Sequence, residues 1–552
     1  MAGRLVLALA QMNPTVGDIP GNLGKLKEVW REAERQAADL VVTPELYLSG
    51  YPPEDFALNP SLLKTVEGAV KGLARATASG PAILVGAPWL EDGNVYNAAL
   101  LLDGGEIAAK IFKHDLPNYG PFDEKRVFTA PPLGGPADFR GHKLGVMICE
   151  DMWKPCVSNN LKEKGAQILV ALNASPFEGD GKQEHRYALA RARAQETGLA
   201  VVYVNQIGGQ DELVFEGSSF VVSADGELAA QAKAWSEDVS VTSWLLKDAL
   251  LVPEKTPLRA HSDGEKAVYE AIMTGLRDYT VKNGFQNVLL GLSGGVDSAL
   301  VAALAVDALG AANVRTVMMP SPHTSKESLE DAAAVAGALG CRLDNIPIDK
   351  AVQAFDNALA DAFAGCEPDV TEENIQARCR GVVLMALANK GGAMVLATGN
   401  KSEMATGYAT LYGDMCGGYA PLKDVYKTSV YRLARWRNAH KPEGGQGPEG
   451  AVIPERVLTK EPSAELRPDQ KDQDILPPYN ELDAILEGLV EGDFGVAEIA
   501  ARGHDAALVK RVWAMLDRAE YKRRQAPPGP KVTHRHLSRD RRYPITNRYV
   551  EK

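Results

Sequence analysis

The sequence predicts an α/β protein of two domains, and two observations carry this prediction. Apolar runs typical of buried strands alternate with helix-like segments along most of the 552-residue chain. Near its middle, the stretch Val-Pro-Glu-Lys-Thr-Pro at 252–257 combines prolines with charge and interrupts the alternation. We therefore place one domain at 1–250, a linker at 251–264 and a second domain at 265–552.

The first half shows the pattern of layered sheets covered by helices. The stretch 24–38 has helical periodicity, and 96–102 and 227–232 are hairpin-like, so the sheets need not be all parallel. Strands are predicted at the apolar runs 5–9, 40–42, 83–85, 144–148, 168–172, 200–204 and 220–222.

The second half begins with an amphipathic helix at 265–282 and then alternates strand and helix. Strands are predicted at 288–292, 314–318, 343–348 and 393–396, with helices at 298–309, 325–339, 479–490 and 506–524. This pattern predicts a doubly wound parallel sheet, which binds ligands beyond the carboxyl ends of its strands. The segments 442–450 and 456–471 are polar and irregular.

Composition limits the possible functions. The net charge of −12 argues against a nucleic-acid or membrane-surface binder. The basic tail at 531–548 is either a solvated end or an edge that meets phosphates, and charge alone does not decide between them. Six cysteines without a CxxC pair fit a reducing cytoplasm. Neither a signal peptide nor a membrane-spanning run is expected.

One loop carries the clearest chemical signal, because it joins a predicted strand to a predicted helix. Small residues let backbone N–H groups approach an anion, and a helix N-terminus favours negative charge. Without Gly-Lys-Ser/Thr, the loop is not a Walker P-loop. The structural alternative is a glycine-rich turn, but two serines and an acid around Gly-Gly are hard to justify by turn chemistry. The loop consists of Gly291, Leu292, Ser293, Gly294, Gly295, Val296, Asp297 and Ser298.

This loop resembles the SGGxDS loop of the N-type ATP pyrophosphatases. The resemblance implies that ATP is split into AMP and pyrophosphate to adenylate a substrate. It makes all eight loop residues ATP-binding candidates.

A second group of residues lies in the first half. Glu45 and Cys149 each follow a predicted strand, and Lys113 follows the stretch 109–112. Individually, a cysteine after a strand is usually buried and inert, and a lone acid or lysine is usually surface charge. Their surroundings, Thr-Pro-Glu-Leu at 43–46, Asn-Tyr-Gly at 118–120 and Ile-Cys-Glu-Asp at 148–151, together resemble the nitrilase superfamily.

That resemblance implies an α-β-β-α sandwich and a catalytic triad. Cys149 would be the nucleophile, Glu45 the general base and Lys113 the stabiliser of the tetrahedral intermediate. The chemistry is consistent, because the thiol needs a base and the oxyanion needs a positive partner. The substrate should be a carboxamide, with Tyr119, Ser175 and Lys182 as the residues that bind it. Ordinary loop structure is the alternative for Tyr119 and Ser175.

Further residues extend the second site. Thr398 and Glu403 follow the strand at 393–396, and Asp297 with Glu403 can share Mg²⁺, which prefers a few carboxylates plus phosphate oxygens. Lys427 is a candidate for ATP phosphate. Asn374 and Arg378 are candidates for a nucleotide substrate, since an arginine grips phosphate bidentately.

Taken together, residues from about 260 onward resemble the NAD⁺ synthetases, and the whole chain resembles their glutamine-dependent bacterial type. The resemblance implies that Asn374, Arg378, Glu403 and Lys522 bind deamido-NAD⁺, and that His534 and Arg535 close over the site. A charged helix end is the alternative for Lys522. Leu411 departs from the family, since ammonia-dependent members tend to have lysine there.

The implied activity is ATP-dependent amidation of deamido-NAD⁺ with ammonia from glutamine, through an adenylate. The implied cosubstrate is ATP, the implied metal Mg²⁺ and the implied assembly a homo-oligomer. A sealed ammonia tunnel between the sites is a further expectation. Two other hypotheses stay open: an amidotransferase with another adenylated acceptor, and a non-catalytic nucleotide sensor that binds ATP without releasing pyrophosphate.

Overall fold

The computed structural model describes residues 4–179, 181–259 and 262–549. The chain forms two compact units, divided between 263 and 264, with the short segment 211–213 belonging to the second. The predicted linker at 251–264 begins inside the first unit, because β15 (Leu250–Pro253) pairs with β14 (Asp238–Lys247) in that unit's larger sheet. Among the described residues, no helix is long and apolar enough to cross a membrane.

The first unit holds two large mixed sheets. One has the order β15-β14-β1-β2-β3-β4-β5 and the other β13-β12-β9-β8-β7-β6. Parallel pairs β1–β2–β3 and β7–β8–β9 form their centres, and hairpins such as β3–β4–β5 extend them. The remaining strands are β1 (Arg4–Gln11), β2 (Leu40–Val42), β3 (Ala82–Glu91), β4 (Asn94–Asp103), β5 (Glu106–Phe112), β6 (Ala137–Phe139), β7 (His142–Ile148), β8 (Ile168–Asn173), β9 (Val201–Asn205), β12 (Phe220–Val222) and β13 (Leu228–Gln231), beside a separate hairpin of β10 (Ile207–Gln210) and β11 (Leu213–Glu216).

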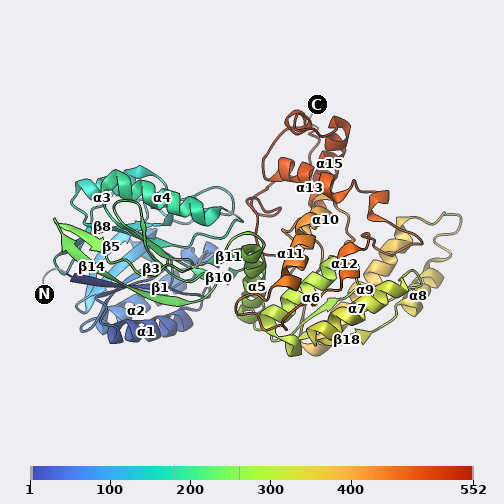
Figure 1. The fold of residues 1–552 in the computed structure, drawn as a ribbon, viewed down its shortest axis with the longest axis horizontal. Helices are drawn as coiled ribbons and strands as arrows, with labels where there is room; N and C mark the ends of the chain where they lie inside the picture. Colours follow the sequence, from blue (N-terminus) through green and yellow to red (C-terminus); the bar gives the residue numbers. More distant parts are fainter. Residues whose placement is uncertain (1–3, 180, 260–261, 550–552) are drawn as a thin grey trace. The chain divides into compact units, whose positions relative to one another are not determined.

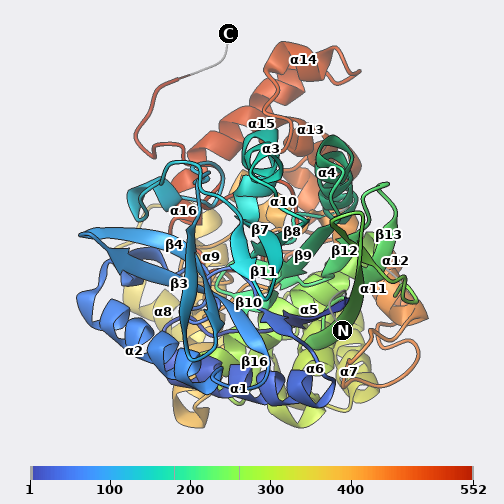
Figure 2. The same ribbon diagram turned by 90° about the vertical axis from the view of Figure 1, so that its left-hand side faces the viewer.

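Helices cover the outer face of each sheet. Helices α1 (Ile19–Arg35) and α2 (Pro60–Ala76) pack on the larger sheet, and α3 (Pro155–Glu163) and α4 (Lys182–Thr197) pack on the smaller one. Figures 1 and 2 show these two helix pairs on opposite sides of the strands. The expected α-β-β-α sandwich is therefore confirmed.

The alternation of side chains along each strand explains these layers. In β4, Ala99 and Leu101 enter the core between the two sheets, whereas Leu100 and Leu102 pack under the helices. The helices begin where a side chain accepts from their free N–H groups, as Asn59 does at the start of α2 from the N–H of Ser61.

The second unit is built around a four-stranded sheet with the order β18-β17-β16-β19. All three neighbouring pairs are parallel, as the sequence predicted. The strands are β16 (Val288–Gly291), β17 (Val314–Met318), β18 (Arg342–Asn345) and β19 (Met394–Val395).

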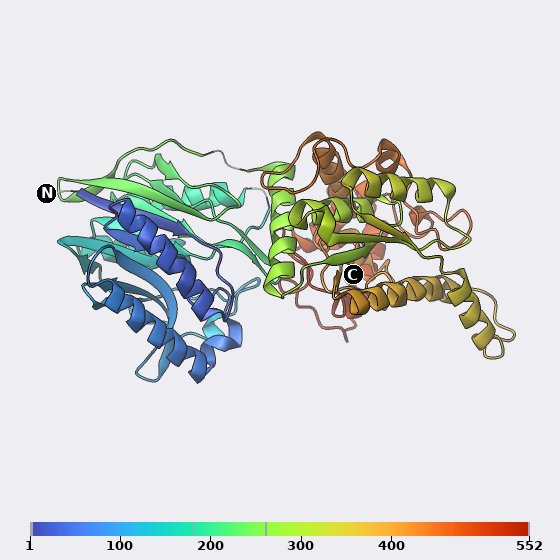
Figure 3. The ribbon, with the colours of Figure 1, turned by 90° about the horizontal axis from the view of Figure 1, so that it is seen from below.

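Helices lie on both faces of this sheet, which makes it doubly wound. Helices α6 (Val296–Leu309) and α7 (Lys326–Leu339) pack together against β17, and α9 (Val370–Gly391) contacts β16 and β19. In Figure 3, α9 is the golden helix on the side of the sheet opposite the yellow-green α7. The other helices of this unit are α5 (Gly264–Lys282), α8 (Asp349–Leu359), α10 (Lys401–Thr406), α11 (Lys427–Ala439), α12 (Glu455–Thr459), α13 (Tyr479–Val490), α14 (Val496–Ala500), α15 (Ala506–Arg518) and α16 (Glu520–Arg523).

Candidate active sites

Cys149 stands at the carboxyl end of β7 in the first unit. It opens a short 3₁₀ turn, Cys149–Met152, with φ of 46°. This left-handed conformation is uncommon for a residue with a side chain and costs about 1–3 kcal/mol, so the surrounding structure must hold it. The residue as a whole is partly exposed.

Glu45 and Lys113 form a buried ion pair in the same unit. Lys113 Nζ lies 2.7 Å from Glu45 Oε1, and neither side chain has exposed surface. The other oxygen of Glu45 accepts from the N–H of Ala174 at 3.1 Å. The Glu45 backbone lies directly against Gly86, where a Cβ would be 2.4 Å from the carbonyl oxygen of Pro44.

A second acid, Glu124, completes the surroundings of Lys113. Lys113 Nζ donates to both carboxylate oxygens of Glu124 at 2.9 Å, and the Tyr51 hydroxyl donates to one of them at 3.0 Å. Burial raises the pKa of Glu124 to about 7, with Lys113 opposing and Glu45 adding to the rise. Sequence reasoning missed Glu124 because it begins a short 3₁₀ turn, Glu124–Arg126, without a distinctive local pattern.

Charges decide the protonation states of this cluster. Burial disfavours the charge on Lys113, but Glu124 and Glu45 outweigh it and raise the pKa of the ammonium well above its usual range. Burial and the Glu45 carboxylate raise the pKa of the Cys149 thiol well above its usual range, against the opposing effect of Lys113. At neutral pH the sulfur is therefore protonated, and its attack requires a base.

The predicted carboxamide-binding residues take three different positions. The Tyr119 hydroxyl donates to Glu150 Oε2 at 2.8 Å, and both residues line a cavity of about 620 Å³. Ser175 Oγ accepts from Arg186 Nε at 3.2 Å. Lys182 pairs with Glu178 at 2.7 Å. The cavity is also lined by His114, Asp115, Leu116, Pro117, Asn118, Lys125, Phe128, Ala130 and Lys154.

In the second unit, the loop between β16 and α6 folds back on itself. Ser298 Oγ accepts from the N–H of Ser293 at 3.2 Å, and the two hydroxyls are 3.1 Å apart. Gly294 has φ of 84° and lies so close to the backbone of Ser328 that a Cβ would be 2.3 Å from its carbonyl oxygen. The loop thus leads into the N-terminus of α6, as an anion cradle requires.

Opposite the loop, one lysine bridges two acids. Lys427 Nζ contacts Asp297 Oδ2 and lies 3.7 Å from Glu403 Oε1. Asn400 Nδ2 donates to the other oxygen of Asp297 at 2.9 Å. The two carboxylates predicted to share a metal are thus held on one ammonium group.

This donor set fits Mg²⁺, which typically takes one or two protein carboxylates and completes its shell with substrate phosphates and water. In the described residues 4–179, 181–259 and 262–549, no group of three or more His, Cys, Asp or Glu side chains is arranged to hold a metal ion. A metal ion held by Asp297 and Glu403 would therefore need further ligands from a bound substrate or water.

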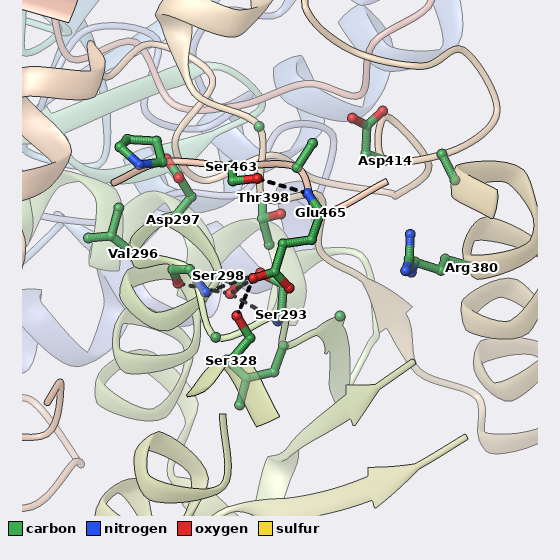
Figure 4. A pocket seen from close by; sticks show the side chains of 18 of the residues that line it. Ser293, Val296, Asp297, Ser298, Ser328, Arg380, Thr398, Asp414, Ser463 and Glu465 are labelled. Atoms are coloured by element: carbon green, nitrogen blue, oxygen red, sulfur yellow. Dashed lines mark hydrogen bonds between the residues drawn. The ribbon is translucent and has the colours of Figure 1, made fainter. Parts of the chain in front are cut away.

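A cavity of about 300 Å³ is lined by all of the residues predicted to bind ATP. All eight loop residues line it, together with Thr398, Glu403 and Lys427. Figure 4 shows Thr398 beside the loop residues Ser293, Asp297 and Ser298, and Glu465 accepting a hydrogen bond from Ser328. Sequence reasoning did not single out five further residues that line the cavity: Arg380, Asp414, Lys460, Glu465 and Asp472.

The other predicted nucleotide-binding residues converge on the segment 407–411 rather than on the cavity wall. Asn374 Oδ1 accepts from the Thr410 hydroxyl at 2.8 Å, and Arg378 Nε donates to the carbonyl of Leu411 at 3.2 Å. Lys522 Nζ donates to the carbonyls of Gly407 and Ala409 at 2.8 and 2.6 Å. None of these three side chains lines the cavity, whereas Arg380, two positions after Arg378 on α9, does.

The basic tail is fastened by buried charges. Lys401 Nζ lies 2.8 Å from Asp424 and donates to the Arg535 carbonyl at 2.8 Å. Lys531 Nζ donates to the carbonyl of His534 at 2.6 Å. Neither His534 nor Arg535 lines the cavity.

Known proteins match the chain over its whole length. The carbon-nitrogen hydrolase family model matches residues 6–249, and the NAD synthase model matches residues 268–526. A glutamine-dependent NAD(+) synthetase of Rhodobacter capsulatus is 47% identical, with all of both chains covered. The chain belongs to the glutamine-dependent NAD(+) synthetases. The Thermotoga maritima member of this family is 44% identical, with 99% of each chain covered.

Solved structures agree with this membership. The glutamine-dependent NAD⁺ synthetase of Acinetobacter baumannii, solved in complex with ADP, is 42% identical and superposes with a TM-score of 0.79 over all of both chains. The Cytophaga hutchinsonii synthetase has a TM-score of 0.82 over 99% of this chain and 98% of its own. At 21% identity, that likeness supports the shared fold alone.

Proposed function

We propose that this glutamine-dependent NAD⁺ synthetase converts deamido-NAD⁺ to NAD⁺, using ATP and ammonia from glutamine and releasing AMP, pyrophosphate and glutamate. The observation that carries the proposal is the cavity that combines the complete loop 291–298 with Thr398, Glu403 and Lys427. Family membership supports it, as does the ADP complex of the Acinetobacter baumannii relative.

In the first half-reaction, Cys149 attacks the glutamine carboxamide while Glu45 takes its proton. Lys113 stabilises the tetrahedral oxyanion, since its ammonium charge is maintained by two carboxylates. The C–N bond then breaks, and the leaving nitrogen receives the proton from Glu45 and departs as ammonia. Water, deprotonated by Glu45, hydrolyses the thioester to glutamate and restores the thiol.

In this proposal, the carboxamide is bound by Tyr119, Ser175 and Lys182. Tyr119 is the member of the three that lines the 620 Å³ cavity. Arg186, which donates to the Ser175 hydroxyl and to its carbonyl at 2.8 Å, holds Ser175 in place.

In the second half-reaction, the nicotinate carboxylate of deamido-NAD⁺ attacks the α-phosphorus of ATP and pyrophosphate leaves. The N–H groups and hydroxyls of the loop 293–298, with Lys427 and Thr398, hold the departing phosphates. Ammonia then attacks the adenylated carboxyl carbon, and AMP leaves. Asn374, Arg378, Glu403 and Lys522 are the proposed contacts to the dinucleotide.

Asp297 and Glu403 are the proposed Mg²⁺ ligands, and the bound ion would supply Lewis-acid stabilisation of phosphate charge. Lys427 keeps these two carboxylates together. We further propose a homo-oligomer by analogy with the family. A cytoplasmic location agrees with six cysteines that are all free.

A competing amidotransferase function would differ from the proposed one in the carboxylate that receives the ammonia. The test supplies ATP, Mg²⁺ and ammonium with deamido-NAD⁺, nicotinate mononucleotide or free nicotinate, and follows pyrophosphate release and amide product. We expect both products with deamido-NAD⁺. Amide formation with another carboxylate in its place would establish the amidotransferase alternative, and ATP binding without pyrophosphate release for every acceptor would establish a sensor.

A further inference from the structure

One polar side chain, that of Asn97, lies on a strand face that carries apolar core residues. In β4, Asn97 has the same strand parity as Ala99 and Leu101, which fill the core between the two sheets. Asn97 is only 1% exposed to solvent. A buried amide destabilises the fold unless its hydrogen bonds are replaced, so the partners of Asn97 explain its presence.

Those partners are the two acids of the thiol site, by which we mean the cluster of Cys149, Glu45, Lys113 and Glu124. Asn97 Nδ2 donates to Glu45 Oε1 at 2.7 Å and lies 3.5 Å from Glu124 Oε2. Its main-chain carbonyl accepts from the N–H of Lys113 at 2.9 Å. The orientation of the amide is determined by these contacts, because a flip would place its oxygen against two carboxylates.

The amide oxygen of Asn97 differs from its N–H groups in its surroundings. Asn97 Oδ1 is buried and has no hydrogen-bond partner within the described ranges 4–179, 181–259 and 262–549. The side-chain hydrogen bonds of Asn97 to described residues are therefore all made by its N–H groups, to the carboxylates of Glu45 and Glu124.

We propose that Asn97 is a positioning residue of the thiol site, whose N–H fixes the Glu45 carboxylate in the orientation that accepts the proton of Cys149. Glu45 is held from three directions: by Asn97 and Lys113 on one oxygen and by the N–H of Ala174 on the other. Lys113 also donates to Glu124 and is the proposed partner of the oxyanion. Asn97 is a neutral donor, so it restrains Glu45 without competing with Lys113 for the oxyanion. This inference rests on the proposed glutaminase reaction.

The test uses the full-length protein with Asn97→Leu, which keeps the number of side-chain heavy atoms and lacks the donor, and with Asn97→Ala, which removes the donor without adding bulk. Asn94→Leu is the matched control, because Asn94 lies at the exposed start of the same strand. The readouts are kcat and KM for glutamine hydrolysis, NAD⁺ formation with ammonium, and the melting temperature.

We expect kcat for glutamine hydrolysis to fall about 10- to 100-fold in both variants, as for the loss of one hydrogen bond to a charged group. KM for glutamine and the ammonium-dependent activity should stay near the wild-type values, whereas the melting temperature should fall because the buried Glu45 carboxylate loses a donor. Asn94→Leu should match the wild type throughout.

Several results would overturn the proposal. An unchanged kcat excludes a positioning role. A raised KM at unchanged kcat makes Asn97 a substrate contact, and a parallel loss of ammonium-dependent activity and melting temperature in both variants makes it structural. Failure of the wild type to hydrolyse glutamine would instead refute the glutaminase function itself.

Discussion

Lys113 Nζ is 2.7 Å from Glu45 Oε1 in a place where neither side chain reaches solvent. Since this carboxylate is the proposed base, Glu45→Gln should lower kcat for glutamine hydrolysis about 10²- to 10⁴-fold, the range for loss of a general base. Ammonium-dependent NAD⁺ formation should persist. Steady-state assays with each nitrogen source test this, and a variant that hydrolyses glutamine normally would remove Glu45 from the mechanism.

The protonation of Cys149 gives a pH-dependent prediction. Its thiol pKa lies well above the usual range, so the reactive thiolate is a small fraction at neutral pH and grows with pH. Alkylation of Cys149 by iodoacetamide should accelerate about tenfold per pH unit from pH 7 to 9, since each unit below a pKa is a factor of ten in thiolate. Mass spectrometry of the Cys149 peptide separates this site from the other five cysteines.

The Glu45 charge raises that thiol pKa, so Glu45→Gln should speed alkylation at a fixed pH while it slows glutamine turnover. A rate that is already constant by pH 7 would instead mean a thiolate stabilised at rest. In that case the attack would not need Glu45.

The closeness of Gly294 to Ser328 predicts a sensitive position in the loop 291–298. A Cβ at Gly294 would lie 2.3 Å from the Ser328 carbonyl oxygen, at a φ of 84° that disfavours any L side chain. Gly294→Ala should abolish ATP-dependent pyrophosphate release. Gly337→Ala is the control, since a Cβ there meets no atom within 4 Å and alanine favours helix α7. Equal activity of the two variants would contradict the packing argument.

The position of Lys427 beside two acids predicts an electrostatic effect when its charge is removed. Lys427→Met leaves Asp297 and Glu403 close together without their shared cation, and breaking a buried pair costs about 3–5 kcal/mol. We expect ammonium-dependent NAD⁺ formation to fall at least 100-fold, with weaker ATP binding by calorimetry. Arg432→Met, on the same helix but exposed and paired with Glu265, should retain activity. Comparable losses in both would point to a general effect on α11.

Sequence patterns predicted the layers and the strand, loop and helix around residues 291–298 because these features are local. The alternation in β4, the parallel order of β16, β17 and β18, and the loop 291–298 each follow from neighbouring residues. Residues brought in by tertiary contacts left no such signal. Glu124 and Asn97 reach Glu45 and Lys113 only through the pairing of separate strands and turns.

The nucleotide-binding residues show the same limit. Arg378 and Arg380 are two positions apart on α9, so they project in different directions, and the register of the helix against the sheet decides which one lines the cavity. That register depends on packing between distant segments. For the same reason, the sequence did not reveal that Glu465 would hydrogen-bond Ser325 and Ser328 beside the loop 291–298.

The most direct test of the two-site function measures NAD⁺ formation from deamido-NAD⁺, ATP and Mg²⁺ with glutamine or ammonium, for the wild type and Cys149→Ala. We predict that the wild type uses both nitrogen sources and that the variant uses ammonium alone. NAD⁺ formation from glutamine by Cys149→Ala, or no NAD⁺ from either protein while the wild type still hydrolyses glutamine, would contradict it.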